Sequence, residues 1–235
     1  MQRYFVKEKI NNQFILESTD IHHIKKVMRC KNNDKIEIVY DKKVYLCNID
    51  NIELMELSII ECCEENRESN VNLTIAVALV QEQKFDLILQ KLTELGVTEI
   101  IPVKTERSIV KIDKAKEEKK KIRWETICKE ASEQSHRVTI PKIHNIITLK
   151  ELTKNNKQLN LICSLNDSTK PLEHYLTNDI KEILFVIGPE GGFAEKEEIF
   201  LSENGFKSTS LGKRVLRVET AAIYVASIIN YIYKG

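Results

Sequence analysis

A glycine-rich segment near the C-terminus offers the clearest chemistry in this sequence. An apolar run over 183–187 leads into the sequence GPEGGF at 188–193, and a helix is expected to begin near Ala194. Glycines let the backbone approach a ligand, and the start of a helix leaves N–H groups without partners. Such a turn would lie at the carboxyl edge of a sheet, the usual ligand site of α/β proteins. A tight turn without a ligand explains the same pattern equally well.

A second segment, at 210–222, places cations beside an apolar loop. A strand is expected to end near Leu211, and a helix to begin at Glu219 or Thr220. Thr220 is a suitable N-terminal cap and Glu219 suits the helix dipole, so both have an explanation that needs no ligand. Arg214 and Arg217 are harder to explain as solvated surface. The following helix is apolar nearly all round, which predicts burial in the core or in a subunit interface.

Two further segments, at 90–108 and 130–137, carry polar residues at the ends of expected elements. Caps or salt bridges explain these residues better than a site does. The GPEGGF run lacks the lysine of a phosphate-binding loop and the spacing of the dinucleotide fingerprint. The five histidines are scattered and define no catalytic triad. The six cysteines form no CxxC pair, which suits free thiols in a reducing compartment, so we expect no metal site.

The composition is that of a globular protein, with 42% hydrophobic residues, 30% charged residues and a formal net charge of +1. This charge does not indicate a nucleic-acid binder, although a basic face can exist in a neutral chain. The N-terminus lacks the apolar core of a signal peptide, and no run of about 18 apolar residues occurs. We expect a cytoplasmic protein without a membrane span.

The first 70 residues are expected to form a small β-rich barrel. Strand-like runs cover 4–6, 14–16, 36–40 and 44–46. Asp20 is expected to cap a helix whose apolar stripe consists of Ile21, Ile24, Val27 and Met28. The polar stretch 64–70 is expected to be a linker.

After this linker, strands alternate with helices, which predicts a mostly parallel sheet with helices on both faces. The expected strands cover 74–80, 97–103, 159–165 and 183–187. The expected helices cover 85–95, where Gly96 would close the helix, and 114–134, 195–204 and 219–233. The predicted domains are therefore 1–70 and 71–235.

Together these segments resemble one family, the ribosomal small-subunit methyltransferase E family of the SPOUT class. The matching runs are KLTELGV at 91–97 with PV and ERS up to 108, the 123–143 segment, IGPEGGF at 187–193 and LG.RVLRVETA at 211–221. The run HHIKKVMRC at 22–30 also resembles part of the family's N-terminal domain. The resemblance spans essentially the whole chain. Asn33-Asp34 and Gln81-Glu82 depart from the usual pattern.

The resemblance implies an α/β fold: a parallel-sheet methyltransferase domain with a SPOUT-type trefoil knot, preceded by a PUA-like β-barrel that binds RNA. General topology rules disfavour knots, so this feature comes from the resemblance alone. The resemblance also implies a homodimer that binds S-adenosylmethionine and methylates N3 of a uridine in 16S ribosomal RNA, within the assembled small subunit. The positions that would surround the cofactor are Leu165, Gly188, Pro189, Glu190, Gly191, Gly192, Leu211, Gly212, Val215, Leu216, Arg217 and Thr220.

Methylation of uridine N3 requires that its proton be lost or shared, because the protonated nitrogen is a poor nucleophile. Arg217 is the candidate cation that favours the uridine anion, and Glu219 is the candidate for positioning the base or accepting the proton. The basic residues that could grip RNA are Arg3, Lys7, Lys25, Lys26, Arg29, Arg107 and Arg137. Ordinary solvated surface is the alternative explanation for each of them.

Three other functions fit parts of the sequence. A ribose 2′-O or guanine methyltransferase of the same knotted class would share the C-terminal loops but not the whole-chain resemblance. A non-catalytic RNA-binding or ribosome-assembly factor would not need the intact 188–192 and 211–220 segments. A nucleotide-phosphate enzyme would need a metal-binding carboxylate pair beside a phosphate loop, and the sequence offers none.

Overall fold

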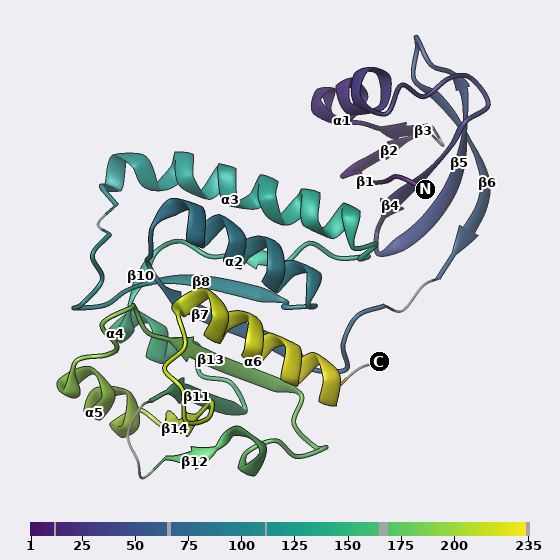
Figure 1. Cartoon of the computed structure of the whole chain (residues 1–235). Coiled ribbons are helices and arrows are strands. Elements are labelled where there is room, and N and C mark those ends of the chain that lie inside the picture. Colours follow the sequence, from purple (N-terminus) through teal and green to yellow (C-terminus); the bar gives the residue numbers. More distant parts are fainter. Residues whose placement is uncertain (12, 65–66, 111, 165–168, 234–235) are drawn as a thin grey trace. The chain divides into compact units, whose positions relative to one another are not determined.

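The computed structural model describes residues 1–11, 13–64, 67–110, 112–164 and 169–233, which form two compact units (Figure 1). The first unit comprises Met1–Glu68 together with Ser132–Thr139. The second comprises Ser69–Ala131 and Ile140–Gly235. A short piece from the middle of the chain therefore belongs to the N-terminal unit, and no sequence pattern indicated this.

A four-stranded sheet forms most of the first unit. Its strands follow the order β1 (Arg3–Phe5), β4 (Lys35–Tyr40), β5 (Lys43–Asn51) and β6 (Glu56–Cys63). A separate hairpin pairs β2 (Glu8–Ile10) with β3 (Gln13–Ile15). The core of this unit includes Tyr4, Phe14, Ile24, Ile36, Ile38 and Leu57. Each run predicted as a strand overlaps one of these strands, whereas β2 and β6 were not predicted.

The helical stretch of this unit differs from its prediction. α1 (Ser18–His22) begins after Glu17, and one π-helical turn (His23–Val27) continues it. Asp20 is therefore not a cap but a buried residue inside the helix. Ile24 is buried as expected, but Val27 and Met28 are exposed. The i→i+5 bonding of the π turn changes the angular spacing of side chains, so the expected α-helical stripe does not continue through it.

Parallel strands build the second unit. Their order is β10 (Ile147–Thr148), β8 (Glu99–Lys104), β7 (Asn72–Ala78), β13 (Glu182–Ile187), β11 (Leu159–Cys163), β14 (Lys207–Ser210) and β12 (Lys170–Pro171), with β9 (Lys142–Ile143) also paired to β8. The central strands β7, β13 and β11 are buried at nearly every position. Burial on both faces is typical of parallel strands covered by helices.

Helices cover both faces of this sheet (Figure 1). On one face, α2 (Glu82–Glu94), α3 (Lys114–Gln134) and α6 (Val218–Ile232) contribute to the core around Ile75, Val77 and Phe185. On the other face, α4 (Leu149–Leu152) and α5 (Glu195–Glu203) contribute to the core around Ala76 and Val186. Short 3₁₀ turns lie at Thr153–Asn155 and Leu172–His174. The predicted α/β class with a mostly parallel sheet is confirmed. None of the helices in the described residues is long and apolar enough to span a membrane.

The ends of two helices test the capping predictions. Gly96 closes α2 as expected: its φ is +81°, and its N–H donates to the carbonyl oxygen of Thr93 at 3.1 Å. α6 begins at Val218, one residue earlier than expected, and Arg217 is its N-cap residue without a capping bond from its side chain. Thr220 is not the cap, because it is an exposed residue inside the first turn.

Candidate functional site

Three neighbouring parallel strands end at one edge of the second unit's sheet. β11 pairs with β13 on one side and with β14 on the other. β13 leads into the 188–193 turn and then α5, whereas β14 leads into the 211–217 loop and then α6. The two segments singled out in the sequence therefore lie on either side of the end of β11. Because ligands bind at the carboxyl ends of parallel strands, the topology makes this edge the candidate site.

A narrow pocket of about 90 Å³ lies among these loops. Its walls come from the three strand ends and the start of α6: Cys163, Ser164, Ile187, Gly188, Pro189, Glu190, Gly192, Phe193, Leu211, Gly212, Arg214, Leu216 and Ala221. Pockets that bury a small organic ligand usually measure roughly 300–1,000 Å³. The pocket among the described residues is therefore smaller than this range.

Backbone conformation favours glycine at two positions in these loops, and packing favours it at a third. The φ angle is +67° at Gly192 and +107° at Gly212, a region that side chains disfavour. Gly188 is required by packing, because a Cβ there would lie 3.1 Å from the ring of Phe193. A side chain at any of these positions would strain the backbone or crowd Phe193.

The segment that follows β8 braces the 188–193 turn. The Arg107 guanidinium donates a hydrogen bond to the carbonyl oxygen of Gly191 at 2.9 Å. The Glu197 carboxylate accepts from the backbone N–H of Ala194 at 2.9 Å and from that of Glu106 at 2.8 Å. The turn and the start of α5 are thus both fixed to this segment, while Arg107 remains an exposed residue.

Four charged side chains interact beside the pocket: Lys84, Glu190, Arg217 and Glu219. The Nζ of Lys84 lies 2.7 Å from Oε1 of Glu190. Their hydrogen bond lowers the pKa of Glu190 and raises the pKa of Lys84, so both groups are charged at neutral pH. The charge of Glu219 also raises the pKa of Lys84, and the charge of Arg217 lowers it. Arg217 and Glu219 are therefore within electrostatic reach of the Lys84–Glu190 pair.

Glu219 has a carboxylate oxygen without a partner. Its Oε2 is buried and accepts no hydrogen bond from any described residue. A buried acceptor left in this state costs about 1–3 kcal/mol. The atom is therefore suited to accept a hydrogen bond from an N–H group of a ligand. Arg217, two residues earlier, is exposed and free of any capping bond.

The polar residues at the end of β11 do not form a nucleophilic site. Burial raises the pKa of the Cys163 thiol, so this thiol stays protonated. The Ser164 hydroxyl donates to Oε2 of Glu198 at 3.2 Å, and no histidine is among the described residues that line the pocket. The described residues also contain no group of three or more potential metal ligands. Neither Cys163 nor Ser164 is therefore activated as a nucleophile by the described residues.

The residues predicted to surround a cofactor fall into three groups. Those that line the pocket are Gly188, Pro189, Glu190, Gly192, Leu211, Gly212 and Leu216. Gly191, Val215, Arg217 and Thr220 belong to the same loops but do not line it, and Leu165 lies outside the described residues. The prediction missed Cys163, Ser164, Ile187, Phe193, Arg214 and Ala221. Most of these adjoin the end of a strand or the start of a helix, and that position was their only signal.

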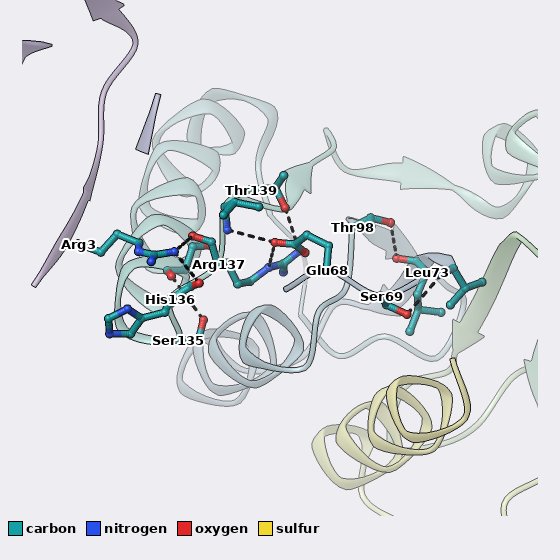
Figure 2. Close-up of polar contacts among 12 residues, drawn as sticks. Arg3, Glu68, Ser69, Leu73, Thr98, Ser135, His136, Arg137 and Thr139 are labelled. Atoms are coloured by element: carbon teal, nitrogen blue, oxygen red, sulfur yellow. Dashed lines mark hydrogen bonds and ion pairs between the residues drawn. The ribbon is translucent and has the colours of Figure 1, made fainter. Parts of the chain in front are cut away.

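Two cations predicted to bind RNA are buried in the first unit. Arg3 is fully buried, and its Nε lies 2.8 Å from Oε2 of Glu37. Its Nη1 donates to the His136 carbonyl oxygen at 2.7 Å (Figure 2). Arg137 is 4% exposed, and its Nη2 lies 2.7 Å from Oε2 of Glu68. The expectation that Arg3 and Arg137 lie on an exposed basic face is therefore corrected, because internal acceptors hold both guanidinium groups.

The other predicted RNA-binding residues have accessible side chains. Lys26 and Arg29 are exposed, and Lys25 donates to the carbonyl oxygen of Glu53 at 2.9 Å. Lys7 is exposed and pairs with Glu17 at 2.9 Å.

The sequence has relatives along its whole length. Residues 67–230 match the RNA methyltransferase domain family, and residues 16–58 match the RNA methyltransferase PUA domain. A ribosomal RNA small subunit methyltransferase E from Bacillus subtilis is 34% identical, over 98% of this chain and 96% of its own. The protein of the same name from Mesomycoplasma hyopneumoniae is 37% identical, over 96% of this chain and 97% of its own.

Solved structures show the same likeness. The crystal structure of a ribosomal RNA small subunit methyltransferase E from Neisseria gonorrhoeae, bound to S-adenosyl methionine, has a TM-score of 0.89 and 32% identity, and the match covers 99% of this chain and 98% of that one. A Legionella pneumophila protein solved with bound SAM has a TM-score of 0.90 and 31% identity, over 98% of this chain and 97% of that one.

Proposed function

This chain belongs to the ribosomal RNA small subunit methyltransferase E family, and we propose that it transfers the methyl group of S-adenosylmethionine to N3 of a uridine in 16S ribosomal RNA. Ribosomal RNA methylation follows from the family, whereas the methylated atom and the 16S substrate belong to the proposal. The observation that carries it is the glycine-walled pocket at the ends of β11, β13 and β14, with the unpartnered Oε2 of Glu219 close to its charged neighbours.

The described residues of this pocket suit S-adenosylmethionine. Ile187, Phe193 and Leu216 provide apolar walls for a purine ring, and the glycine turns leave backbone groups accessible to polar edges. A Cβ at Gly188 would crowd the Phe193 ring at 3.1 Å, so at this position the backbone itself forms the wall. When bound there, the cofactor supplies the reactive methyl group, while the protein supplies orientation and electrostatics.

The protein's own task is to prepare N3 of the uridine. Oε2 of Glu219 accepts a hydrogen bond from N3–H and draws the proton away, because it is buried and no described residue donates to it. The guanidinium of Arg217 favours the negative charge that this shift leaves on the base. Holding N3 in line with the methyl group supplies much of the remaining acceleration. No nucleophile from the protein is needed.

The proposal extends to substrate, partner and compartment. Residues 1–70 act as the RNA-binding domain, with Lys25, Lys26 and Arg29 on the RNA, and residues 71–235 carry out methyl transfer with Arg107 beside the pocket. The substrate is 16S RNA in the assembled small subunit, in the cytoplasm. A homodimer forms through the outer side of α6, where Tyr224 is 46% and Tyr231 74% exposed. Large exposed aromatic side chains support an interface there.

Nucleoside mass spectrometry of small-subunit RNA, from cells with and without this gene, tests the reaction. One uridine is expected to lose its N3 methyl group in the deletion strain and to regain it with the wild-type gene, but not with Arg217→Ala. A missing methyl group on a ribose or a guanine would contradict the proposed atom. Unchanged RNA in the deletion strain would contradict the proposed substrate.

A further inference from the structure

A second hollow lies at the edge of the parallel sheet, where β12 pairs with β14. It consists of two adjoining depressions of about 560 and 520 Å³. Lys170, Tyr175 and Lys207 line both, so these three side chains stand where the depressions meet. We call this surface the β12–β14 groove. The groove is separate from the cofactor pocket, and its described lining residues include none of the first unit.

The two lysines of the groove, Lys170 and Lys207, form no ion pair within the described part of the chain, although both are exposed. Three other lysines of this unit, Lys84, Lys104 and Lys196, pair with glutamates at 2.6 to 2.8 Å. The free charges of the groove are therefore available to an anion.

Two aromatic side chains contact these lysines. Nζ of Lys170 lies 3.0 Å from Nε2 of His174, and because an ammonium group only donates, the histidine nitrogen accepts. Nζ of Lys207 lies 5.7 Å from the ring centroid of Tyr175. The Tyr175 hydroxyl is fixed in turn by donating to the Ser208 carbonyl oxygen at 3.2 Å. These contacts position the two ammonium groups without pairing them with a carboxylate.

The charges along the groove show which part suits an anion. Asp179 lines one depression, and the hydrogen bond from Thr177 lowers its pKa, so it is an anion at neutral pH. The other depression has no acidic side chain among its described lining residues, which include Ser202, Gly205 and Ser208. Hydroxyl groups and a bare glycine backbone are common contacts of phosphate oxygens. The anion-binding part is therefore the Ser202–Ser208 side.

Strand β14 connects the groove to the cofactor pocket. Lys207 begins this strand, and Leu211, which lines the pocket, directly follows its end. At ~3.3 Å per residue the two positions are about 13 Å apart along the strand. This distance corresponds to about four stacked nucleotides at ~3.4 Å each. An RNA strand with one base at the pocket can therefore reach the groove without leaving this unit.

We propose that the β12–β14 groove binds the phosphate backbone of the RNA strand that runs away from the target nucleotide. This inference rests on the proposed function, because it needs an RNA substrate, and it adds an RNA contact in the second unit. Lys170 and Lys207 bind phosphate oxygens. The ring of Tyr175 contacts the ammonium group of Lys207 and holds it in place.

Charge reversal of both lysines tests the groove. The variant Lys170→Glu/Lys207→Glu is compared with Lys150→Glu/Lys154→Glu, which reverses two exposed lysines of the same unit on α4 and the turn after it. The probe is undermethylated 16S RNA, naked and in small subunits, with affinity measured at several salt concentrations. S-adenosylmethionine binding is measured in parallel by calorimetry as a control for folding.

The groove variant is expected to bind RNA at least tenfold more weakly, with the log–log salt slope shallower by about 1.4–1.8, as expected for two lost phosphate contacts. The Lys150/Lys154 variant should stay within about threefold of wild type, and Lys170→Arg/Lys207→Arg should keep wild-type affinity. Equal losses in both reversal variants, or an unchanged salt slope, would overturn the proposal. A wild-type protein that binds RNA but methylates no N3 would instead refute the proposed function and leave the groove result interpretable.

Discussion

Arg217 precedes α6 and lies within electrostatic reach of Lys84, yet it neither caps the helix nor lines the cofactor pocket. A role in stabilising charge on the base therefore predicts a selective defect. Arg217→Ala should lower kcat by about 100-fold or more, the usual cost of losing such a contact, while S-adenosylmethionine affinity changes by less than about threefold. Single-turnover methylation and calorimetry measure the two effects. Lys213→Ala, in the same exposed loop, serves as control and should keep near-normal kcat. Parallel losses of kcat and cofactor affinity would contradict the assignment.

Glu219 offers a second test at the level of a single atom. Glu219→Gln keeps the shape of the side chain but replaces a carboxylate by an amide, which is a far weaker proton acceptor. We expect kcat to fall by about 100-fold, because general-base catalysis contributes typically 10²–10⁴. The same substitution should not destabilise the fold, since the buried Oε2 has no described partner to lose. Unfolding in urea and kcat are measured together, and a stability loss with normal kcat would show that Glu219 has only a structural role.

The Lys84–Glu190 pair predicts a pH dependence. The hydrogen bond from Lys84 lowers the pKa of Glu190 below its usual value of about 4.3. Its contribution to the shape of the 188–193 turn is therefore complete above about pH 4.3 and is lost as the pH falls through the lowered pKa. Cofactor affinity of the wild type should be constant from neutral pH down to the usual carboxyl pKa of about 4.3, and decline as the pH falls further through the lowered pKa of Glu190. Glu190→Gln should bind more weakly at pH 7 and lack this acidic step. The same acidic step in the variant would contradict the role of the pair.

The 188–193 turn provides a prediction for a whole loop. Gly188→Ala places a Cβ 3.1 Å from the Phe193 ring, and this ring is packed in the core with little freedom to move. Overpacking of this kind costs about 1–3 kcal/mol, so cofactor affinity should fall by about fivefold or more. Gly191→Ala is the matched comparison, because its Cβ would meet only the Arg107 side chain at 3.5 Å. Calorimetry should show a clearly smaller loss there, and equal losses would exclude packing against Phe193 as the cause.

Sequence patterns predict long elements better than short ones. The buried strands follow from their apolar runs, the helix at 114–134 was predicted over its full length, and Gly96 follows from its backbone freedom. The two-residue strands β9, β10 and β12 carry too few residues for any periodicity. The end of α1 departs from prediction because a π turn has no recognised sequence pattern. The site follows the same division: the glycines were found from spacing, whereas Phe193 and Ala221 became wall residues only through tertiary packing.

The membership of Ser132–Thr139 in the first unit is a property of the whole molecule, and local sequence patterns do not reveal it. It depends on polar groups far apart in sequence, as in the contact of Arg3 with the carbonyl oxygens of His136 and Arg137 at 2.7 and 3.2 Å (Figure 2). His136 adopts a φ of +57°, which is uncommon for a residue other than glycine. An arginine in the sequence can bind RNA phosphates, but it can equally bind carbonyl and carboxylate oxygens inside the protein. Its charge alone therefore does not predict contact with RNA.

The Glu68–Arg137 contact yields a prediction for the two units. Glu68 accepts hydrogen bonds from Nη2 of Arg137 at 2.7 Å and from the backbone N–H of Val138 at 3.2 Å. These bonds attach residues 132–139 to the rest of the first unit. Arg137→Ala leaves a largely buried carboxylate without its cation, and breaking such a pair costs about 3–5 kcal/mol. We expect hydrogen exchange to accelerate in β1, β4 and residues 132–139, while S-adenosylmethionine affinity, a property of the second unit, stays within about twofold.

The double variant Glu68→Leu/Arg137→Met removes both charges and should recover most of the stability. Acceleration spread equally over both units, or no recovery in the double variant, would show that the contact does not stabilise the first unit in this way.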